Sequence, residues 1–205
     1  MTILALEFSS ARRSVALADG TGRLLAGAAA ATGQRGTDAF GLIAGAMARA
    51  KVLREQVGVI AVGLGPGSYT GIRAAIAVAQ GWQLARPIKL LGISSADSLA
   101  AQGQAEGLAG RINLVIDAQR GEFYLATWEI SKSERREIAP LKIVTAAEIA
   151  EREKSGEICA GPGLARALFP TAATVAALAA GRGDFMAGEK LEPIYLRETT
   201  FVRAR

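Results

Sequence analysis

The 205-residue sequence contains no histidine and only one cysteine, Cys159. Without histidine, the chain cannot build Ser-His-Asp or Cys-His nucleophile pairs, HExxH zinc sites or most transition-metal sites. One cysteine forms no internal disulfide and no multi-cysteine metal site, which favours an intracellular protein over a secreted one. Four possibilities remain for the function of this chain: carboxylate chemistry, lysine chemistry, an anion-binding backbone or no chemistry at all. We favour the last.

The sequence also lacks an apolar run as long as the roughly 20 residues of a membrane span. Its first six residues are apolar but have no basic leader before them, so they predict a strand and not a signal peptide. Half of all residues are hydrophobic, enough for a sizeable core. The net charge of +5 permits contact with a polyanion without requiring it. We expect a cytoplasmic protein with no membrane segment.

Strand and helix patterns alternate along the first half, as in α/β folds. We expect strands over 2–7, 14–18, 24–30, 59–64 and 88–93, and helices over 37–51 and 70–85 and from Ser94 onward. The second half predicts helices over 145–154 and 174–180, a short strand over 157–160 and a charged stretch over 131–137.

The opening pattern returns near residue 111, since Ile112–Asp117 repeats the apolar run and acid of Ile3–Glu7. Each run is followed by a polar turn and a second strand, which indicates an internal repeat, although so short a match can also arise by chance. The repeat predicts two related lobes, over 1–104 and 105–205, with a duplicated strand-turn-strand motif.

Two groups of residues are candidates for binding an anion or a nucleotide. The glycine-rich loop over 65–71 enters a helix, where backbone N–H groups can hold an anion, but it matches neither a Walker A loop nor GxGxxG. The alternative interpretation of this loop is a tight turn in which Thr70 caps the helix. The acids that end the two repeated strands could hold Mg2+ or polarise water, or could simply accept turn hydrogen bonds. The candidate contacts are Glu7, Ser9, Gly65, Gly67, Ser68 and Asp117.

The helix over 70–85 is apolar almost all round, which predicts burial on two sides, within its own domain or against another chain. Together with the preceding helix it gives a candidate partner interface of Phe40, Ile43, Met47, Ala75, Ile76, Ala79 and Trp82. Cys159 is expected to be a buried hydrophobe. The paired and tail arginines could touch RNA or be ordinary surface: Arg12, Arg13, Arg135, Arg136, Arg197, Arg203 and Arg205.

Several motifs in combination resemble the TsaB (YeaZ) family. They are Ile3-Leu4-Ala5-Leu6-Glu7, Gly65-Pro66-Gly67-Ser68-Tyr69-Thr70-Gly71-Ile72-Arg73, Gly92-Ile93-Ser94-Ser95, Val115-Ile116-Asp117-Ala118-Gln119-Arg120-Gly121-Glu122-Phe123-Tyr124 and Pro193-Ile194-Tyr195-Leu196-Arg197. The agreement covers residues 1 to about 130 and the C-terminal motif.

The resemblance implies the actin-like ATPase (ribonuclease H-like) fold with two related lobes. It also implies a cytosolic, non-catalytic partner of the transferase TsaD that works with the ATPase TsaE, or forms a homodimer without TsaD. The complex places threonylcarbamoyl on the adenosine beside the anticodon of tRNAs reading ANN codons, so tRNA contact is indirect. The family implies no cofactor of this chain's own; ATP and a metal belong to the partner subunits.

Two departures from the family pattern stand out. Glu7-Phe8 replaces the usual Asp-Thr, and Arg35-Gly36-Thr37-Asp38 lacks the histidine common near the first helix. The runner-up function is a small-molecule kinase or carbamoyl transferase using Glu7 and Asp117. A third interpretation, a metallopeptidase homologue of the M22 type, lacks ligands for a metal.

Overall fold

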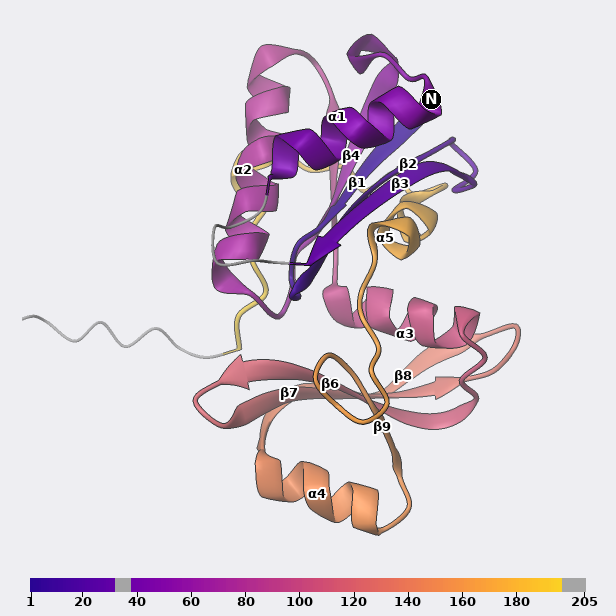
Figure 1. The fold of residues 1–205 in the computed structure, drawn as a ribbon, viewed down its shortest axis with the longest axis vertical. Helices are drawn as coiled ribbons and strands as arrows, with labels where there is room; N and C mark the ends of the chain where they lie inside the picture. Colours follow the sequence, from indigo (N-terminus) through magenta and orange to yellow (C-terminus); the bar gives the residue numbers. More distant parts are fainter. Residues whose placement is uncertain (32–37, 197–205) are drawn as a thin grey trace, which may run out of the picture.

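A computed structural model describes residues 1–31 and 38–196 of the chain, which form two sheets with helices packed around them (Figure 1). The first sheet contains β1 (Thr2–Glu7), β2 (Arg12–Ala18), β3 (Leu24–Ala31), β4 (Val57–Gly63) and β5 (Lys89–Ile93), in the order β3-β2-β1-β4-β5. Strands β1, β2 and β3 form an antiparallel meander, and β4 and β5 run parallel to β1.

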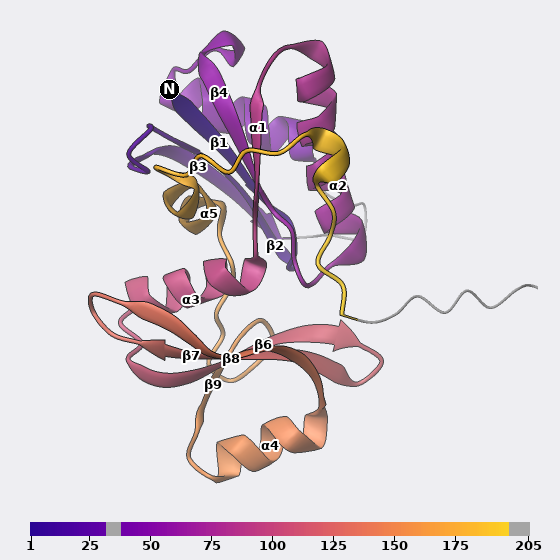
Figure 2. The same ribbon diagram turned by 180° about the vertical axis from the view of Figure 1, so that it is seen from behind.

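The first sheet is covered on both faces. Alternate side chains of β1 point to opposite sides, so Leu4 and Leu6 join the core beneath α1 (Ala39–Ala50) and α2 (Tyr69–Ala85). Ile3 and Ala5 instead pack against α5 (Ala172–Ala179), which comes from the far end of the chain (Figure 2). Burial on both faces explains why β1 and β4 are nearly continuous apolar runs.

The second sheet contains β6 (Gly110–Gln119), β7 (Glu122–Ile130), β8 (Arg135–Thr145) and β9 (Ile158–Ala160), in the order β8-β7-β6-β9. Helix α3 (Ser95–Ala105) packs on the face toward the first sheet, and α4 (Ala146–Lys154) covers the other face (Figure 1). Two short 3-10 helices, Arg54–Gln56 and Gly188–Lys190, complete the described elements.

The internal repeat is present in the structure. The series β1-β2-β3-α1-β4 and β6-β7-β8-α4-β9 each place an antiparallel meander, a helix and then a strand parallel to the first. The predicted α/β fold of two related lobes with a duplicated strand-turn-strand motif is therefore confirmed. The boundary between residues 104 and 105 stays a prediction; α5 packs on the first sheet although it lies beyond that boundary in the chain.

One strand was not predicted, and one local prediction was wrong. Strand β8 begins inside the charged stretch, at Arg135, because an edge strand with one face toward solvent tolerates charged side chains. Helix α2 is buried mainly on one face: Arg73 and Ala77 are exposed, and Leu84 is 90% exposed. None of the described helices combines the length and the apolar character of a membrane span.

Candidate functional site: a cleft between the two lobes

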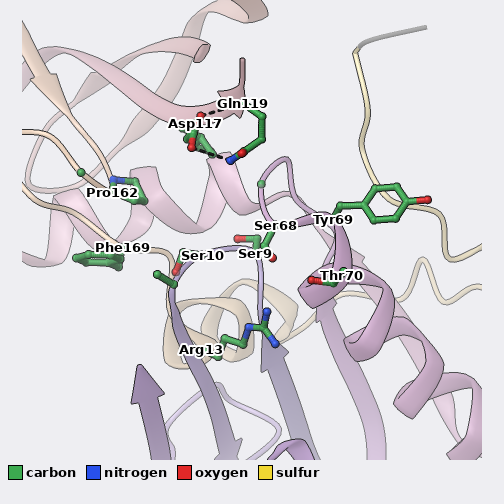
Figure 3. A pocket seen from close by; sticks show the side chains of 14 residues that line it. Ser9, Ser10, Arg13, Ser68, Tyr69, Thr70, Asp117, Gln119, Pro162 and Phe169 are labelled. Carbon is green, nitrogen blue, oxygen red and sulfur yellow. Dashed lines mark hydrogen bonds between the residues drawn. The ribbon is translucent and has the colours of Figure 1, made fainter. Parts of the chain in front are cut away.

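A cavity of about 700 Å3 lies between the lobes, where the first hairpin of each lobe approaches the other (Figure 3). Its lining comes from the β1–β2 turn, the start of α2, the end of β6 and the loop after β9. The lining residues are Ser9, Ser10, Ala11, Arg13, Gly67, Ser68, Tyr69, Thr70, Ile116, Asp117, Gln119, Pro162, Gly163 and Phe169.

The same tripeptide comes after the equivalent strand in each lobe. Gly65-Pro66-Gly67 leaves β4 and Gly161-Pro162-Gly163 leaves β9, and both strands run parallel to the first strand of their sheet. Each tripeptide contributes to the cleft. Sequence reasoning missed this second signal, because the alignment of the repeat stopped at the first hairpin.

The glycines of these loops allow backbone to touch backbone. A Cβ on Gly67 would overlap the carbonyl oxygen of Ser9, and a Cβ on Gly161 would overlap that of Val115. The amide of Ser68 donates to the same Ser9 oxygen at 2.6 Å. The cleft floor is thus built from directly packed main chain, which leaves its shape little freedom.

Glu7 lies behind the cleft floor and is fully buried. Its carboxylate accepts hydrogen bonds from the Ser9 amide at 2.8 Å and the Ser95 hydroxyl at 2.9 Å. The Ser95 oxygen in turn accepts from the Gly65 amide at 3.1 Å. Burial raises the pKa of Glu7, while the hydrogen bonds from the two serines oppose the rise. Glu7 therefore ties three loops together and does not line the cleft.

Asp117 lies at the cleft surface, but its carboxylate is hydrogen-bonded within its own turn. It accepts from the Gln119 amide and from Gln119 Nε2, both at 2.7 Å. These bonds stabilise a turn in which Gln119 and Arg120 adopt positive φ angles of 65° and 59°. Because Glu7 is inaccessible from the cleft, the two acids do not form the facing pair that a metal would need. Within the described residues, no three acidic or cysteine side chains are grouped as metal ligands.

The first lobe gives the cleft a polar wall, and the second lobe gives it a wall of mixed character. Ser68, not Thr70, caps α2, accepting from the Gly71 amide at 3.3 Å. Beside this helix start lie further hydroxyls and the guanidinium of Arg13, whose pKa is lowered by burial. On the second lobe's side, Pro162 and Phe169 lie near Asp117 and Gln119 (Figure 3). Ile116 also lines the cleft.

The polar wall has the chemistry to accept an anionic group. Four of the six predicted contacts, Ser9, Gly67, Ser68 and Asp117, line the cleft, whereas Glu7 and Gly65 lie behind it. Sequence reasoning missed Arg13 as a cleft residue, because no local pattern marks the burial of one arginine in a pair.

The predicted helical interface needs a correction. Five of its residues pack inside the chain's own core: Ile43, Met47, Ala75, Ile76 and Ala79. The surface of α1 and α2 instead presents Phe40, which is 67% exposed, and half-buried Trp82. Together with exposed Leu53 they line a hollow of about 280 Å3. The interface itself stays a prediction, now based on these three side chains.

The remaining candidates are the cysteine and the arginines. Cys159 is buried and burial raises the pKa of its thiol, which keeps it unreactive. Arg135 donates to the side chain of Gln104, and Arg12 and Arg136 are exposed. Arg35, Arg197, Arg203 and Arg205 lie outside the described residues.

Comparison with known proteins agrees with the motifs. A family model described as "TsaD: tRNA N6-adenosine threonylcarbamoyltransferase" matches residues 38–160. The "tRNA threonylcarbamoyladenosine biosynthesis protein TsaB" of Escherichia coli (strain K12) is 35% identical over 74 residues, which are 36% of this chain and 32% of that protein. The protein of the same name from Bacillus subtilis (strain 168) is 32% identical over 102 residues, or 49% of this chain and 43% of that protein. The matched segments thus span less than half of these relatives.

Solved structures extend the likeness to nearly the whole chain. "YeaZ from Pseudomonas aeruginosa" has a TM-score of 0.78 and 25% identity, covering 95% of this chain and 99% of that chain. A second structure, "an uncharacterized protein with similarity to peptidase YEAZ from Pseudomonas aeruginosa", has a TM-score of 0.80 and 27% identity, covering 96% and 99%. With the motifs, the repeated lobes and these matches together, the chain belongs to the TsaD family and, within it, to the TsaB (YeaZ) proteins.

Proposed function

We propose that the chain is a non-catalytic partner subunit in tRNA threonylcarbamoyladenosine biosynthesis. It binds TsaD in the cytoplasm and supports transfer of threonylcarbamoyl to the adenosine beside the anticodon of ANN-decoding tRNAs. TsaE, ATP and a metal act through the other subunits, and tRNA meets this chain only through the complex. The observation that carries the proposal is the likeness to proteins named for this biosynthesis, which extends over both lobes in the YeaZ structures.

The surface of α1 and α2 supports a binding role. Phe40 and Leu53 are 67% and 66% exposed and flank Trp82 around one hollow. Grouped apolar side chains on a surface mark interaction sites, and aromatic anchors set in a hollow dominate the energetics of many interfaces. We place TsaD on this surface, with a second copy of the chain as the occupant when TsaD is absent.

The arrangement of the acids favours this role over a kinase or carbamoyl transferase. Glu7 is fully buried and already accepts two hydrogen bonds, and Asp117 accepts two from Gln119. Acid–base work at a substrate requires a carboxylate that can reach it, and buried Glu7 cannot reach a substrate in the cleft. Both acids are engaged in holding the cleft's loops.

A reconstituted modification assay tests the proposal. The purified chain is mixed with TsaD, TsaE, tRNA, ATP, bicarbonate, threonine and the threonylcarbamoyl-AMP synthase, and modified adenosine is measured. We expect modification to require the chain and to fall by about tenfold or more in the Phe40→Asp variant, because a charge in a desolvated contact is costly. Ala167→Asp, in an exposed loop of the other lobe, is the matched control and should behave as the parent chain.

Two results would overturn the proposal. One is full modification without the chain. The other is an Asp117→Asn variant that still binds TsaD on gel filtration yet supports no modification, which would give the chain chemistry of its own.

A further inference from the structure

The cleft between the lobes carries opposite charges on its two walls. The first lobe contributes the guanidinium of Arg13, which is 9% exposed, and the second lobe contributes the exposed carboxylate of Asp117. Figure 3 shows these two side chains on opposite sides of the hydroxyl groups of Ser9, Ser10 and Ser68. Among the described residues that line the cleft, no other side chain carries a formal charge. A ligand that spans the cleft therefore meets one positive and one negative group.

The first wall is suited to a carboxylate. The Arg13 guanidinium has five N–H donors, so it can keep a partner within the chain and still donate to a ligand. It lies beside the start of α2, where Thr70 adds a hydroxyl to the same wall (Figure 3). The first N–H groups of a helix have no partner within the helix and favour negative charge. An anionic group thus finds several donors at this end of the cleft.

The opposite wall can accept hydrogen bonds from a cationic group. The Gln119 amide donates to Asp117 Oδ1 and the Gln119 side chain donates to Asp117 Oδ2, both at 2.7 Å. Each carboxylate oxygen has two lone pairs, so each keeps an acceptor position after these bonds are made. Because Asp117 is exposed and lines the cleft, an ammonium group can reach these positions.

The second lobe also offers apolar contacts to a ligand. Pro162 and Phe169 both line the cleft, and Figure 3 shows them on the same side of it. Pockets for small molecules combine apolar lining with a few placed polar groups and measure about 300–1,000 Å3. The cavity of about 700 Å3 falls within this range. The ligand can therefore carry an apolar part besides its two charged groups.

We propose that the cleft binds a small zwitterion with an apolar side chain, a free amino acid or a short peptide. Its carboxylate lies against Arg13 and the start of α2, and its ammonium group lies against Asp117. The apolar side chain contacts Pro162 and Phe169. This site gives the chain a ligand of its own, in addition to its role as a partner subunit.

A nucleoside triphosphate fits these charges less well. Its phosphates would meet the Asp117 carboxylate as a like charge, which opposes binding. Buried Glu7 cannot help to hold the divalent cation that such a ligand carries. A simple carboxylate, in turn, would leave Asp117 without an opposite charge. Only a zwitterion satisfies both walls at once.

Isothermal titration calorimetry on the purified full chain tests the proposal. Leucine and leucyl-leucine are zwitterions in which the charged groups are separated by different lengths. Isocaproate lacks the ammonium group of leucine, isopentylamine lacks its carboxylate, and Mg–ATP tests the nucleotide alternative. We expect the better of the two zwitterions to bind at least about tenfold more tightly than each of the other three probes, because each of them loses a charge-assisted contact.

Two variants test the walls separately. Arg13→Gln should weaken zwitterion binding by about tenfold and leave isopentylamine binding unchanged, and Asp117→Asn should do the same with isocaproate binding unchanged. The matched controls Arg12→Gln and Glu129→Gln remove the same charges at exposed positions outside the cleft and should bind every probe as the parent chain does. Circular dichroism confirms the fold of each variant. If Arg13→Gln does not fold, Asp117→Asn, at an exposed position, decides the test.

Any one of four results would overturn the inference. The first is isocaproate or isopentylamine binding as tightly as the zwitterions, which would leave a site for a single charge. The second is tighter binding of Mg–ATP than of both zwitterions. The others are no binding of any probe, and unchanged zwitterion affinity in folded Asp117→Asn. The measurement uses the chain without TsaD, so its failure would leave the proposed partner role standing, and loss of that role would leave this site standing.

Discussion

The two lobes share a chain path but use its equivalent acids differently. Glu7 ends β1 and is fully buried, whereas Asp117, in the same position near the end of β6, is exposed. In the first lobe, the chain continues after β4 through α2 and β5 to the start of α3. This path brings Ser95 against Glu7. The second sheet stops at β9, and the chain then leaves for α5 on the other lobe. The segment that comes after each repeat, and not the repeat itself, decides the role of the acid.

The loops after β4 and β9, in contrast, require glycine for the same reason in both lobes. Gly67 and Gly161 each lie where a Cβ would overlap a main-chain carbonyl oxygen of the neighbouring strand or turn. Direct backbone packing at the cleft is therefore the feature the lobes share.

The largest expected effect tests that shared feature. Gly67→Ala and Gly161→Ala should each lower the free energy of unfolding by about 3 kcal/mol, because a rigid backbone must shift to admit the methyl group. Urea denaturation measures both. Gly163→Ala is the control: its φ is +84° but its Cβ would meet nothing within 4 Å, so only the strain of about 1 kcal/mol applies. A Gly161→Ala loss no larger than that of Gly163→Ala would contradict the packing argument.

The next effect tests the difference between the acids. Glu7→Ala should cost about 2 kcal/mol, because it leaves the buried Ser95 hydroxyl and Ser9 amide short of an acceptor. Asp117→Ala should cost less than about 1 kcal/mol, since water replaces the bonds of an exposed turn. Equal losses in chemical denaturation would remove the distinction between the lobes.

The pH dependence of stability sharpens the same distinction. Burial raises the pKa of Glu7 in the folded chain above its value in the unfolded chain. Between these two pKa values the folded state holds more protons, so the contribution of Glu7 is fully present below the unfolded pKa and is lost as pH rises through the folded pKa. Relative to Glu7→Gln, the parent chain should therefore lose stability as pH rises from 4.5, by at most about 1.4 kcal/mol per pH unit.

Unfolding curves of the parent chain and Glu7→Gln at several pH values check this. A rising difference between the parent and Glu7→Gln, with the parent gaining stability above pH 4.5, would contradict the direction of the pKa shift.

Local signals in the sequence predicted much of the fold, and the failures have physical causes. Helices were expected to begin near residue 37 and at Ser94, and Asp38 and Ser94 are the residues that cap α1 and α3. Strand β8 was missed because its charged residues mask the two-residue alternation of apolar and polar side chains. The burial of α2 was overestimated because many of its apolar residues are alanines, which are also common on exposed helix faces.

The candidate site was predicted only in part. The glycine loop and the two acids were visible as motifs, but the burial of Glu7 depends on Ser95, which is 88 residues away in the chain. Long-range contacts of this kind leave no spacing pattern in a single sequence. The cleft residues Arg13 and Phe169 could not be predicted for the same reason. Each reaches the cleft only because the two lobes meet.

The smallest expected effect concerns the helices that the repeat makes equivalent, α1 and α4. Asp38 caps α1 by accepting from the Gly41 amide at 2.8 Å, and Thr145 caps α4 in a reciprocal box with Glu148. Asp38→Ala and Thr145→Ala should each cost about 0.5–1 kcal/mol, because each frees a helix amide that water can reach. Thermal unfolding measures both. A much larger loss for Asp38→Ala would mean that the first lobe depends on its cap in a way that the second does not, so that the lobes differ in their helices as well as in their acids.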